Sequence, residues 1–304
     1  MIEETIDQLE AAIRDKNEQN LINIVQDNSQ TKLLQLREDY KTKFKRYLLE
    51  DLKKADFNEN FHNAITGIFK NPVEYDAFLL NKAMKGIGSN KNIMTEIICF
   101  RDKERINAIK DKYQEMYGKD LLAELKDESS GVYQKIMLGV LEGNRNVNAN
   151  PDLEQCSKIA EELYKAGEGK FGTNEEVFIN YFTTLSPEEL LLVCKDYHKK
   201  YGRTMVEALK AEFSGAVKDI LRAILYSMFS PCEYFAKQIM ESIKGAGTDN
   251  DKLIRIIITR YSIDMKLLKK YFKRMYNKDL LTEIKDDVSG SYGKLLEALI
   301  NKQN

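Results

Sequence analysis

Apolar residues recur at helical spacing along most of this 304-residue chain. In 253–257 and 267–275, for example, they return every three or four positions, which is the pattern of an amphipathic helix with one buried face. No stretch alternates apolar and polar residues for long enough to predict a sheet, and the chain contains only 4 prolines. We therefore expect an all-α fold.

The helical pattern repeats itself along the chain. Residues 84–90 (MKGIGSN) match 243–249 (IKGAGTD), and 117–131 match 276–290 without any slip of register. A third copy is looser, and a copy at the N-terminus keeps only the helical pattern. A polar linker, Gly143 to Asn150, separates the first pair of copies from the second. We predict four helical repeats, at 3–69, 74–142, 152–226 and 232–301.

Proline and capping residues predict where several helices begin. Pro187 follows a serine and precedes two glutamates, a context that is typical of the first residue of a helix. Thr173 and Glu176 have the spacing of a capping box, and Thr248 with Asp251 is a near relative of it. The sequence therefore predicts that both threonines cap helices.

Charge and composition narrow the class of protein. Lysine and arginine number 47 against 48 aspartates and glutamates, so no standing field attracts nucleic acid or an anionic membrane. The four cysteines show no CxxC spacing, the N-terminus is acidic where a signal peptide is basic and then apolar, and no apolar run approaches the ~18 residues that span a bilayer. We expect a cytoplasmic protein that is monomeric in solution, with assembly on a membrane left open. Helical pattern within the first ~5 residues leaves little room for a regulatory tail.

A distant carboxylate accompanies each glycine tract. A Lys-Gly-X-Gly tract alone predicts only a helix C-terminus in which glycine adopts a left-handed conformation. The acids lie 42 positions beyond the tracts: Glu128 after Gly86 (128 − 86), Glu212 after Lys170 (212 − 170) and Asp287 after Gly245 (287 − 245). Acids before a glycine turn are ordinary caps or solvated residues when taken singly, but three at one spacing suggest a shared purpose.

Calcium chemistry fits this combination. Ca²⁺ takes roughly six to eight oxygen ligands, commonly backbone carbonyls, a bidentate carboxylate and water. A glycine loop at a helix C-terminus offers carbonyls at the negative end of the helix dipole. A carboxylate brought to the loop by the intervening helices would close one side of the shell and leave positions for lipid phosphate oxygens.

These paired tracts, and the longer break after the second repeat, resemble the annexin family over nearly the whole chain. The resemblance implies a slightly curved disc of four five-helix repeats, whose convex face carries calcium loops and meets anionic phospholipid membranes. Lys85 and Lys244, inside the loops, would contact the membrane. The implied calcium ligands are the carbonyls of Met84, Gly86 and Gly88 with Glu128, and the carbonyls of Ile243, Gly245 and Gly247 with Asp287.

The third and first copies depart from the motif. In the third, which has an inserted loop, the resemblance implies ligands at the carbonyls of Gly167, Lys170 and Gly172 with Glu212. Some annexins carry an aromatic residue in this loop that enters the headgroup region, and Phe171 stands there, although it would fit equally well folded onto its own repeat. In the first copy, residues 12–17 lack glycine and the acid position falls near Ala55, so we expect no site.

Two other classes of function remain to be weighed. An enzyme has little support, because His62 and His198 lie in charge-rich helical segments without a catalytic motif and are better explained as solvated residues. A cytoskeletal or membrane-associated scaffold with vestigial calcium sites is the stronger alternative, since the first copy is degenerate. Such a scaffold would bind its partner without calcium.

Overall fold

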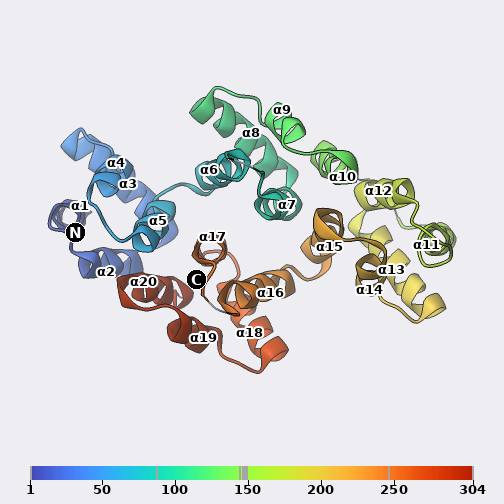
Figure 1. Cartoon of the computed structure of the whole chain (residues 1–304). Coiled ribbons are helices and arrows are strands. Elements are labelled where there is room, and N and C mark those ends of the chain that lie inside the picture. The colour runs from blue at the N-terminus through green and yellow to red at the C-terminus, as the bar shows by residue number, and fades with distance from the viewer. Residues whose placement is uncertain (1, 87, 144, 146–149, 246, 303–304) are drawn as a thin grey trace. The chain divides into compact units, whose positions relative to one another are not determined.

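The computed structural model describes residues 2–86, 88–143, 145, 150–245 and 247–302, so most of the expected linker, Gly143 to Asn150, lies outside the described residues. In the described part of the chain every regular element is an α-helix, and the twenty helices are numbered α1 to α20 in Figure 1. They fall into four successive sets of five. The predicted all-α fold of four five-helix repeats is therefore confirmed.

The first and fourth sets belong to one compact unit, which comprises residues 1–75 and 232–304. Within it, α2 and α5 of the first set both contact α20 of the fourth, and α5 also contacts α17. Its helices are α1 (Ile2–Arg14), α2 (Glu18–Asp27), α3 (Gln30–Phe44), α4 (Leu48–Lys54), α5 (Glu59–Ile68), α16 (Pro231–Ile243), α17 (Asn250–Arg260), α18 (Met265–Tyr276), α19 (Leu280–Asp287) and α20 (Gly290–Ile300).

The second and third sets form the other unit, residues 76–231, and α6 begins in the first unit and continues in this one. Here α7 packs against α15, and α10 packs against α12. The helices are α6 (Pro72–Met84), α7 (Lys91–Phe100), α8 (Lys103–Tyr117), α9 (Leu121–Asp127), α10 (Gly131–Glu142), α11 (Leu153–Ala166), α12 (Glu175–Thr184), α13 (Pro187–Tyr201), α14 (Met205–Glu212) and α15 (Gly215–Phe229).

The repeats share a core position on their third helix. Tyr40, Tyr113, Tyr197 and Phe272 occupy it, and none is more than 1% exposed. Each places an aromatic ring where the apolar faces of the helices meet, so one buried anchor recurs in every repeat. The helix starts also follow the sequence prediction at α13, where Pro187 is the first residue and Ser186 forms a reciprocal capping box with Glu189.

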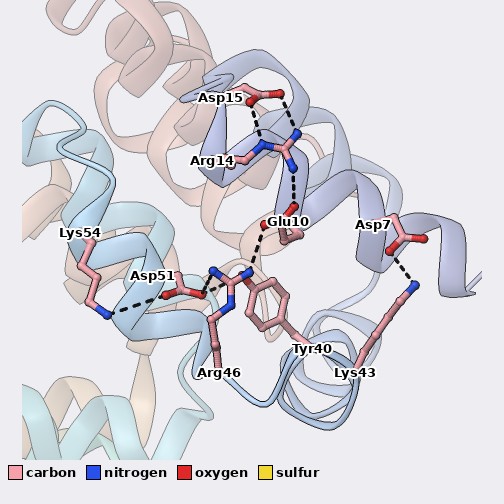
Figure 2. A network of polar contacts seen from close by, with 9 residues as sticks. All are labelled: Asp7, Glu10, Arg14, Asp15, Tyr40, Lys43, Arg46, Asp51 and Lys54. Atoms are coloured by element: carbon pink, nitrogen blue, oxygen red, sulfur yellow. Dashed lines mark hydrogen bonds and ion pairs between the residues drawn. The ribbon is translucent and has the colours of Figure 1, made fainter.

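Polar contacts hold the first repeat together where its helices α1, α3 and α4 meet (Figure 2). Arg46, just after α3, pairs with Glu10 of α1 at 3.0 Å and with Asp51 of α4 at 3.4 Å. The Tyr40 hydroxyl donates to Asp51 at 2.9 Å, and Arg14 pairs with Glu10 at 3.0 Å. Glu10 and Asp51 are largely shielded from water, which makes this network a more effective link between helices than an isolated surface pair.

Candidate functional site

Glycine loops join the first and second helices of the second and fourth repeats. In the fourth repeat, Gly245 has φ 119° and Gly247 has φ 99°, backbone conformations that residues with a Cβ rarely adopt. Gly86 and Gly88 of the second repeat likewise have positive φ. Met84 and Ile243 are the last residues of α6 and α16, where the carbonyls have no donors within the helix. Both loops therefore turn backbone oxygens away from regular helical bonding.

One hydrogen bond closes this junction in all four repeats. The amide of the residue that precedes the second helix donates to a carbonyl near the end of the first helix. The pairs are Asn17 to Ala12, Asn90 to Ala83, Asn174 to Ala166 and Asp249 to Ser242, at 2.7–2.8 Å. The bond spans 5 positions in the first repeat (17 − 12) but 7 in the second and fourth (90 − 83 and 249 − 242) and 8 in the third (174 − 166). The first repeat thus keeps the frame and lacks the loop.

In the third repeat a carboxylate lies directly against the loop. Glu212, the last residue of α14, accepts a hydrogen bond from the Thr173 hydroxyl at 2.5 Å. A Cβ placed on Gly167 would lie 3.1 Å from the Glu212 carboxyl carbon. A larger residue at this position would therefore press against the acid. The Gly167 carbonyl accepts the Lys170 amide at 3.0 Å, which leaves it one lone pair for another partner.

The fourth repeat has the same arrangement. Asp287, the last residue of α19, accepts a hydrogen bond from the Thr248 hydroxyl at 2.5 Å. Like Glu212, it is half-buried. In the described residues, the carbonyls of Gly245 and Gly247 accept no hydrogen bond. An acid from the fourth helix and free loop oxygens are thus placed at one junction.

The second repeat differs from these two. Its hydroxyl, Ser89, donates to the backbone oxygen of Glu128 at 2.8 Å and not to the carboxylate. Glu128 follows the last turn of α9 as its C-cap, whereas Glu212 and Asp287 are still helical. The loop thus meets Glu128 through the main chain, and the described residues show no hydroxyl holding its carboxylate. The common 42-residue spacing predicted an acid at the loop of each of these three repeats, and the structure separates the second repeat from the third and fourth.

The predicted threonine caps are wrong. Asn174 occupies the N-cap of α12 without a side-chain cap, and the Asp249 side chain caps α17 by accepting from the Lys252 amide. The threonines lie one position before these N-caps, because α12 begins at Glu175 and α17 at Asn250. Their hydroxyls donate instead to acids 39 positions away. Sequence reasoning therefore missed Thr173 and Thr248 as site residues, although their constant distance from the acids was a usable signal.

The first repeat has a lysine side chain and a small apolar residue at this junction. Lys16 adopts the left-handed conformation with φ 52°, and its ammonium pairs with Asp56 at 3.5 Å. Ala55, at the acid position, is buried. Neither a glycine loop nor a carboxylate at the acid position is present, as the sequence predicts for this repeat.

Several predicted membrane contacts are exposed. Phe171 is 107% exposed, so its ring does not fold onto the third repeat. Lys85, Lys244 and Lys170 are exposed as well, and the Lys85 ammonium lies 5.7 Å from the Tyr117 ring centroid. Gly172 has φ 80° and is exposed beside Phe171. The loops therefore present basic and aromatic side chains to solvent.

The histidines behave differently from each other. His198 is exposed on α13, as expected of a solvated residue. His62 on α5 is half-buried, and within the described chain its Nε2 atom is buried without a hydrogen-bond partner. The expectation that His62 is solvated is wrong, because α5 packs against α17 and α20.

Metal coordination by side chains alone is not available in the described residues, where no three histidine, cysteine, aspartate or glutamate side chains are grouped. At the third and fourth loops, the donor set is one carboxylate with neighbouring backbone oxygens. Such a set fits a hard cation that prefers oxygen ligands, of which calcium is the example that tolerates irregular geometry. Nowhere in the described part of the chain is a helix long and apolar enough to cross a membrane.

The protein is thus built of helical repeats in which a carboxylate lies beside the loop between the first and second helices. The sequence model of the annexin family matches residues 75–140, 158–224 and 234–299. Human annexin A5 is 35% identical over 95% of this chain and 90% of its own length. Human annexin A7 is 33% identical over 94% of this chain, which spans only 58% of that relative. The chain belongs to the annexin family.

Solved structures agree with this assignment. The structure of an annexin A8 variant superposes with a TM-score of 0.93, at 31% identity over 99% of this chain and 95% of that one. Calcium-bound annexin (Sm)1 superposes with a TM-score of 0.82, at 25% identity over 99% of this chain and 90% of that one. The family model does not match the first repeat, the one in which the loop is short.

Proposed function

We propose that this protein attaches to anionic phospholipid membranes, of the phosphatidylserine kind, when calcium is present. The observation that carries the proposal is the pairing of a carboxylate with an open loop in the third and fourth repeats. Membership of the annexin family and the calcium-bound state of annexin (Sm)1 support it. The protein then works as a peripheral protein at the cytoplasmic face of a membrane.

Each part of the junction has a separate role in this proposal. One calcium ion is held by the carbonyls of Gly245 and Gly247 with Asp287. Another is held by the carbonyls of Lys170 and Gly172 with Glu212. Thr248 and Thr173 orient the acids, as outer partners of metal ligands commonly do. Bound calcium supplies positive charge and open coordination positions for lipid phosphate oxygens.

Side chains around the loops complete the contact. Phe171 is an exposed ring that suits the headgroup region, and Lys85 and Lys244 add charge that attracts acidic lipid. Several weak sites that engage one surface gain from effective concentration, so binding rises steeply with calcium and with acidic lipid content. A further site in the second repeat uses the carbonyls of Met84, Gly86 and Gly88 with Glu128. There the Ser89 hydroxyl bonds to the Glu128 backbone and not to its carboxylate.

Sedimentation with phosphatidylserine vesicles, with and without calcium, tests the proposal. The wild-type protein should sediment only with calcium, and the double variant Glu212→Gln, Asp287→Asn should need at least about tenfold more calcium while its helical circular dichroism stays the same. Equal sedimentation without calcium would contradict the proposal and favour the calcium-independent scaffold. An unchanged calcium requirement in the double variant would contradict the site assignment alone.

A further inference from the structure

The third helix of the fourth repeat, α18, carries basic residues and no acid (Figure 1 labels the helix). Its charged residues are Lys266, Lys269, Lys270, Lys273 and Arg274, all within 12 positions. The whole chain has 47 basic and 48 acidic residues. The concentration of positive charge on α18 is therefore a local feature and not a consequence of composition.

The equivalent helices of the other repeats mix both signs of charge. Their acids are Glu38 and Asp39 in α3, Glu104, Asp111 and Glu115 in α8, and Glu188, Glu189 and Asp196 in α13. Basic residues of these helices have carboxylate partners. Arg105 of α8 pairs with Asp76 at 2.9 Å, and Lys200 of α13 pairs with its own Asp196 at 2.8 Å. A uniformly basic third helix thus belongs to repeat 4 and not to the fold.

The basic side chains of α18 have no carboxylate partner among the described residues. The Lys273 ammonium donates to the Asn277 carbonyl at 3.1 Å, and the Arg274 guanidinium lies 5.3 Å from the Tyr271 ring centroid. Lys266 and Lys270 are four positions apart (270 − 266), as are Lys270 and Arg274 (274 − 270). Like charges at this spacing destabilise a helix, so carboxylates supplied from outside would relieve the repulsion.

Two large aliphatic side chains lie among these charges. Ile263, in the turn before α18, is 67% exposed, and Leu267 is 48% exposed. Ile263 lies nine positions before the buried Phe272 (272 − 263), and the residues nine positions before the corresponding anchors of the other repeats are all polar: Thr31, Glu104 and Glu188. An exposed apolar side chain at this position is therefore also particular to repeat 4.

The exposed residues share one face of the helix. Side chains three or four positions apart are neighbours on a helix surface, so Ile263 and Leu267 form an apolar strip bordered by basic residues. The buried residues Met265, Leu268 and Phe272 occupy the opposite face and belong to the core. The exposed set, called the α18 patch below, is Ile263, Lys266, Leu267, Lys270, Lys273 and Arg274.

The α18 patch lies away from the proposed calcium loop. α17 begins at Asn250, directly after the loop, and ends at Arg260, just before the turn that holds Ile263. Its 11 residues place about 16 Å of helix between the loop and this turn. The patch is thus separate from the ion site, and an inference about it does not depend on the proposed function.

The side chains of the patch favour one kind of anionic partner. Single-stranded nucleic acid stacks on exposed aromatic rings, and no aromatic side chain of α18 is exposed. A membrane interface favours aromatic anchors for the same reason that Phe171 suits it, whereas the patch offers two aliphatic side chains. An apolar strip bordered by lysines is the complement of a helix whose apolar strip is bordered by carboxylates.

We propose that the α18 patch binds an acidic amphipathic helix of a partner protein. The apolar residues of that helix lie on Ile263 and Leu267, and its carboxylates pair with Lys266, Lys270 and Arg274. Charge complementarity sets the orientation of the partner and raises the rate of association, and burial of the aliphatic strip adds affinity. The interaction needs no calcium, because none of these residues takes part in the ion site.

Fluorescence anisotropy with labelled peptides tests the proposal on the full-length protein without calcium. The probe is a peptide of about 18 residues, or five helical turns, whose leucines form one strip with glutamates on both sides. One control has the same composition with the leucines spread around the helix, and another is polyglutamate of equal charge. The probe should bind at least about tenfold more tightly than either control, since it alone matches both charge and strip.

Substitutions on α18 locate the binding surface. Lys266→Glu with Lys270→Glu should weaken binding of the probe at least about tenfold, because it replaces attraction by repulsion. Leu267→Ser should weaken it about threefold to tenfold through loss of apolar contact. The matched control is Lys195→Glu with Lys199→Glu, the same charge change at the same spacing on two exposed residues of α13, and it should leave binding unchanged. Circular dichroism confirms that each variant is folded.

The remaining outcomes would overturn the proposal. Equal binding of the probe and its two controls would reduce the patch to non-specific attraction, and full affinity in the Lys266→Glu, Lys270→Glu variant would place the contact elsewhere. Tighter binding of a single-stranded oligonucleotide than of the probe would assign the patch to nucleic acid. Calcium-free sedimentation with phosphatidylserine vesicles that this variant abolishes would assign it to a membrane. Calcium-dependent sedimentation of the wild-type protein, measured separately, reports on the proposed function alone.

Discussion

The junctions between the first two helices of repeats 1 and 4 share a frame and differ in content. Asn17 and Asp249 make equivalent amide-to-carbonyl bonds at 2.8 Å. Inside that frame, repeat 4 has two more residues and a hydroxyl-clamped Asp287, whereas repeat 1 has Lys16 paired with Asp56 and the buried Ala55. The hydrogen bond that closes the junction can therefore be kept while the candidate calcium site is lost. The hydrogen bond depends on helix packing, and the site depends on the loop and a few side chains.

Repeat 1 carries positive side chains of its own near these positions. Arg46 links Glu10 and Asp51 across three helical segments, and Lys16 supplies a positive charge at its own junction (Figure 2 shows the Arg46 network). In repeat 4 the equivalent positive charge is expected from calcium. Substitutions at these two junctions should therefore change calcium binding by different amounts.

The largest effect is expected from the acid itself. Asp287→Asn removes the charge at the fourth-repeat junction and should raise the calcium concentration that half-fills this site by at least about tenfold. Calcium titration by calorimetry, with and without lipid, measures it. Asp56→Asn is the matched control in repeat 1 and should leave the calcium affinity unchanged. A comparable loss in Asp56→Asn would show that repeat 1 does hold an ion.

A smaller effect is expected from the hydroxyl clamp. Thr248→Val keeps the shape of the side chain but removes the donor to Asp287. It should weaken calcium binding at this loop about tenfold, the lower end of the range for outer partners of metal ligands. Ser89→Ala is the control, because its hydroxyl bonds to a backbone oxygen of the second repeat. Titration of both variants should show a larger change in Thr248→Val, and equal changes would remove the distinction between clamped and unclamped acids.

Transfer of the site should have a modest effect. Replacing residues 12–17 by the sequence of residues 242–249, together with Ala55→Asp, gives repeat 1 the loop length and the acid of repeat 4. One additional weak site on the same unit should lower the calcium needed for vesicle binding about twofold. Loop replacement with Ala55 retained is the control. If the complete graft folds but binds no additional calcium, loop and acid are not sufficient.

The smallest effect concerns the backbone. Lys16 adopts a left-handed conformation that is unfavourable for a residue with a Cβ. Lys16→Gly should therefore stabilise the fold by up to ~1 kcal/mol, because the relief of this strain exceeds the entropy that glycine adds to the unfolded chain. Gly245→Ala at φ 119° should destabilise it by ~1–2 kcal/mol. Urea unfolding measures both. The two changes should have opposite signs, and the same sign in both would contradict the conformational explanation.

Much of the fold was predictable because it is encoded locally. Apolar spacing, prolines at helix starts and two matching segments predicted helices and repeats without knowledge of any contact. The threonines show where local reasoning failed, since Thr248 has a plausible cap partner three positions away and bonds instead to Asp287 at 39 positions. Because α17 begins one residue later than the pattern predicts, Thr248 precedes the N-cap, and its hydroxyl donates to an acceptor that packing brings near it. Packing is not visible in a window of sequence.

By itself the sequence determined a helical chain of four repeats and the spacing between each loop and its acid, because periodicity and spacing are properties along the chain. Only the tertiary structure decided that threonine hydroxyls hold the acids of repeats 3 and 4, whereas in repeat 2 the equivalent hydroxyl, Ser89, bonds to the backbone of Glu128. It also decided that the Tyr292 hydroxyl is buried with no hydrogen-bond partner among the described residues. These features depend on which helices lie next to each other, and small differences in helix ends and neighbours change a hydrogen bond without changing the pattern of residues.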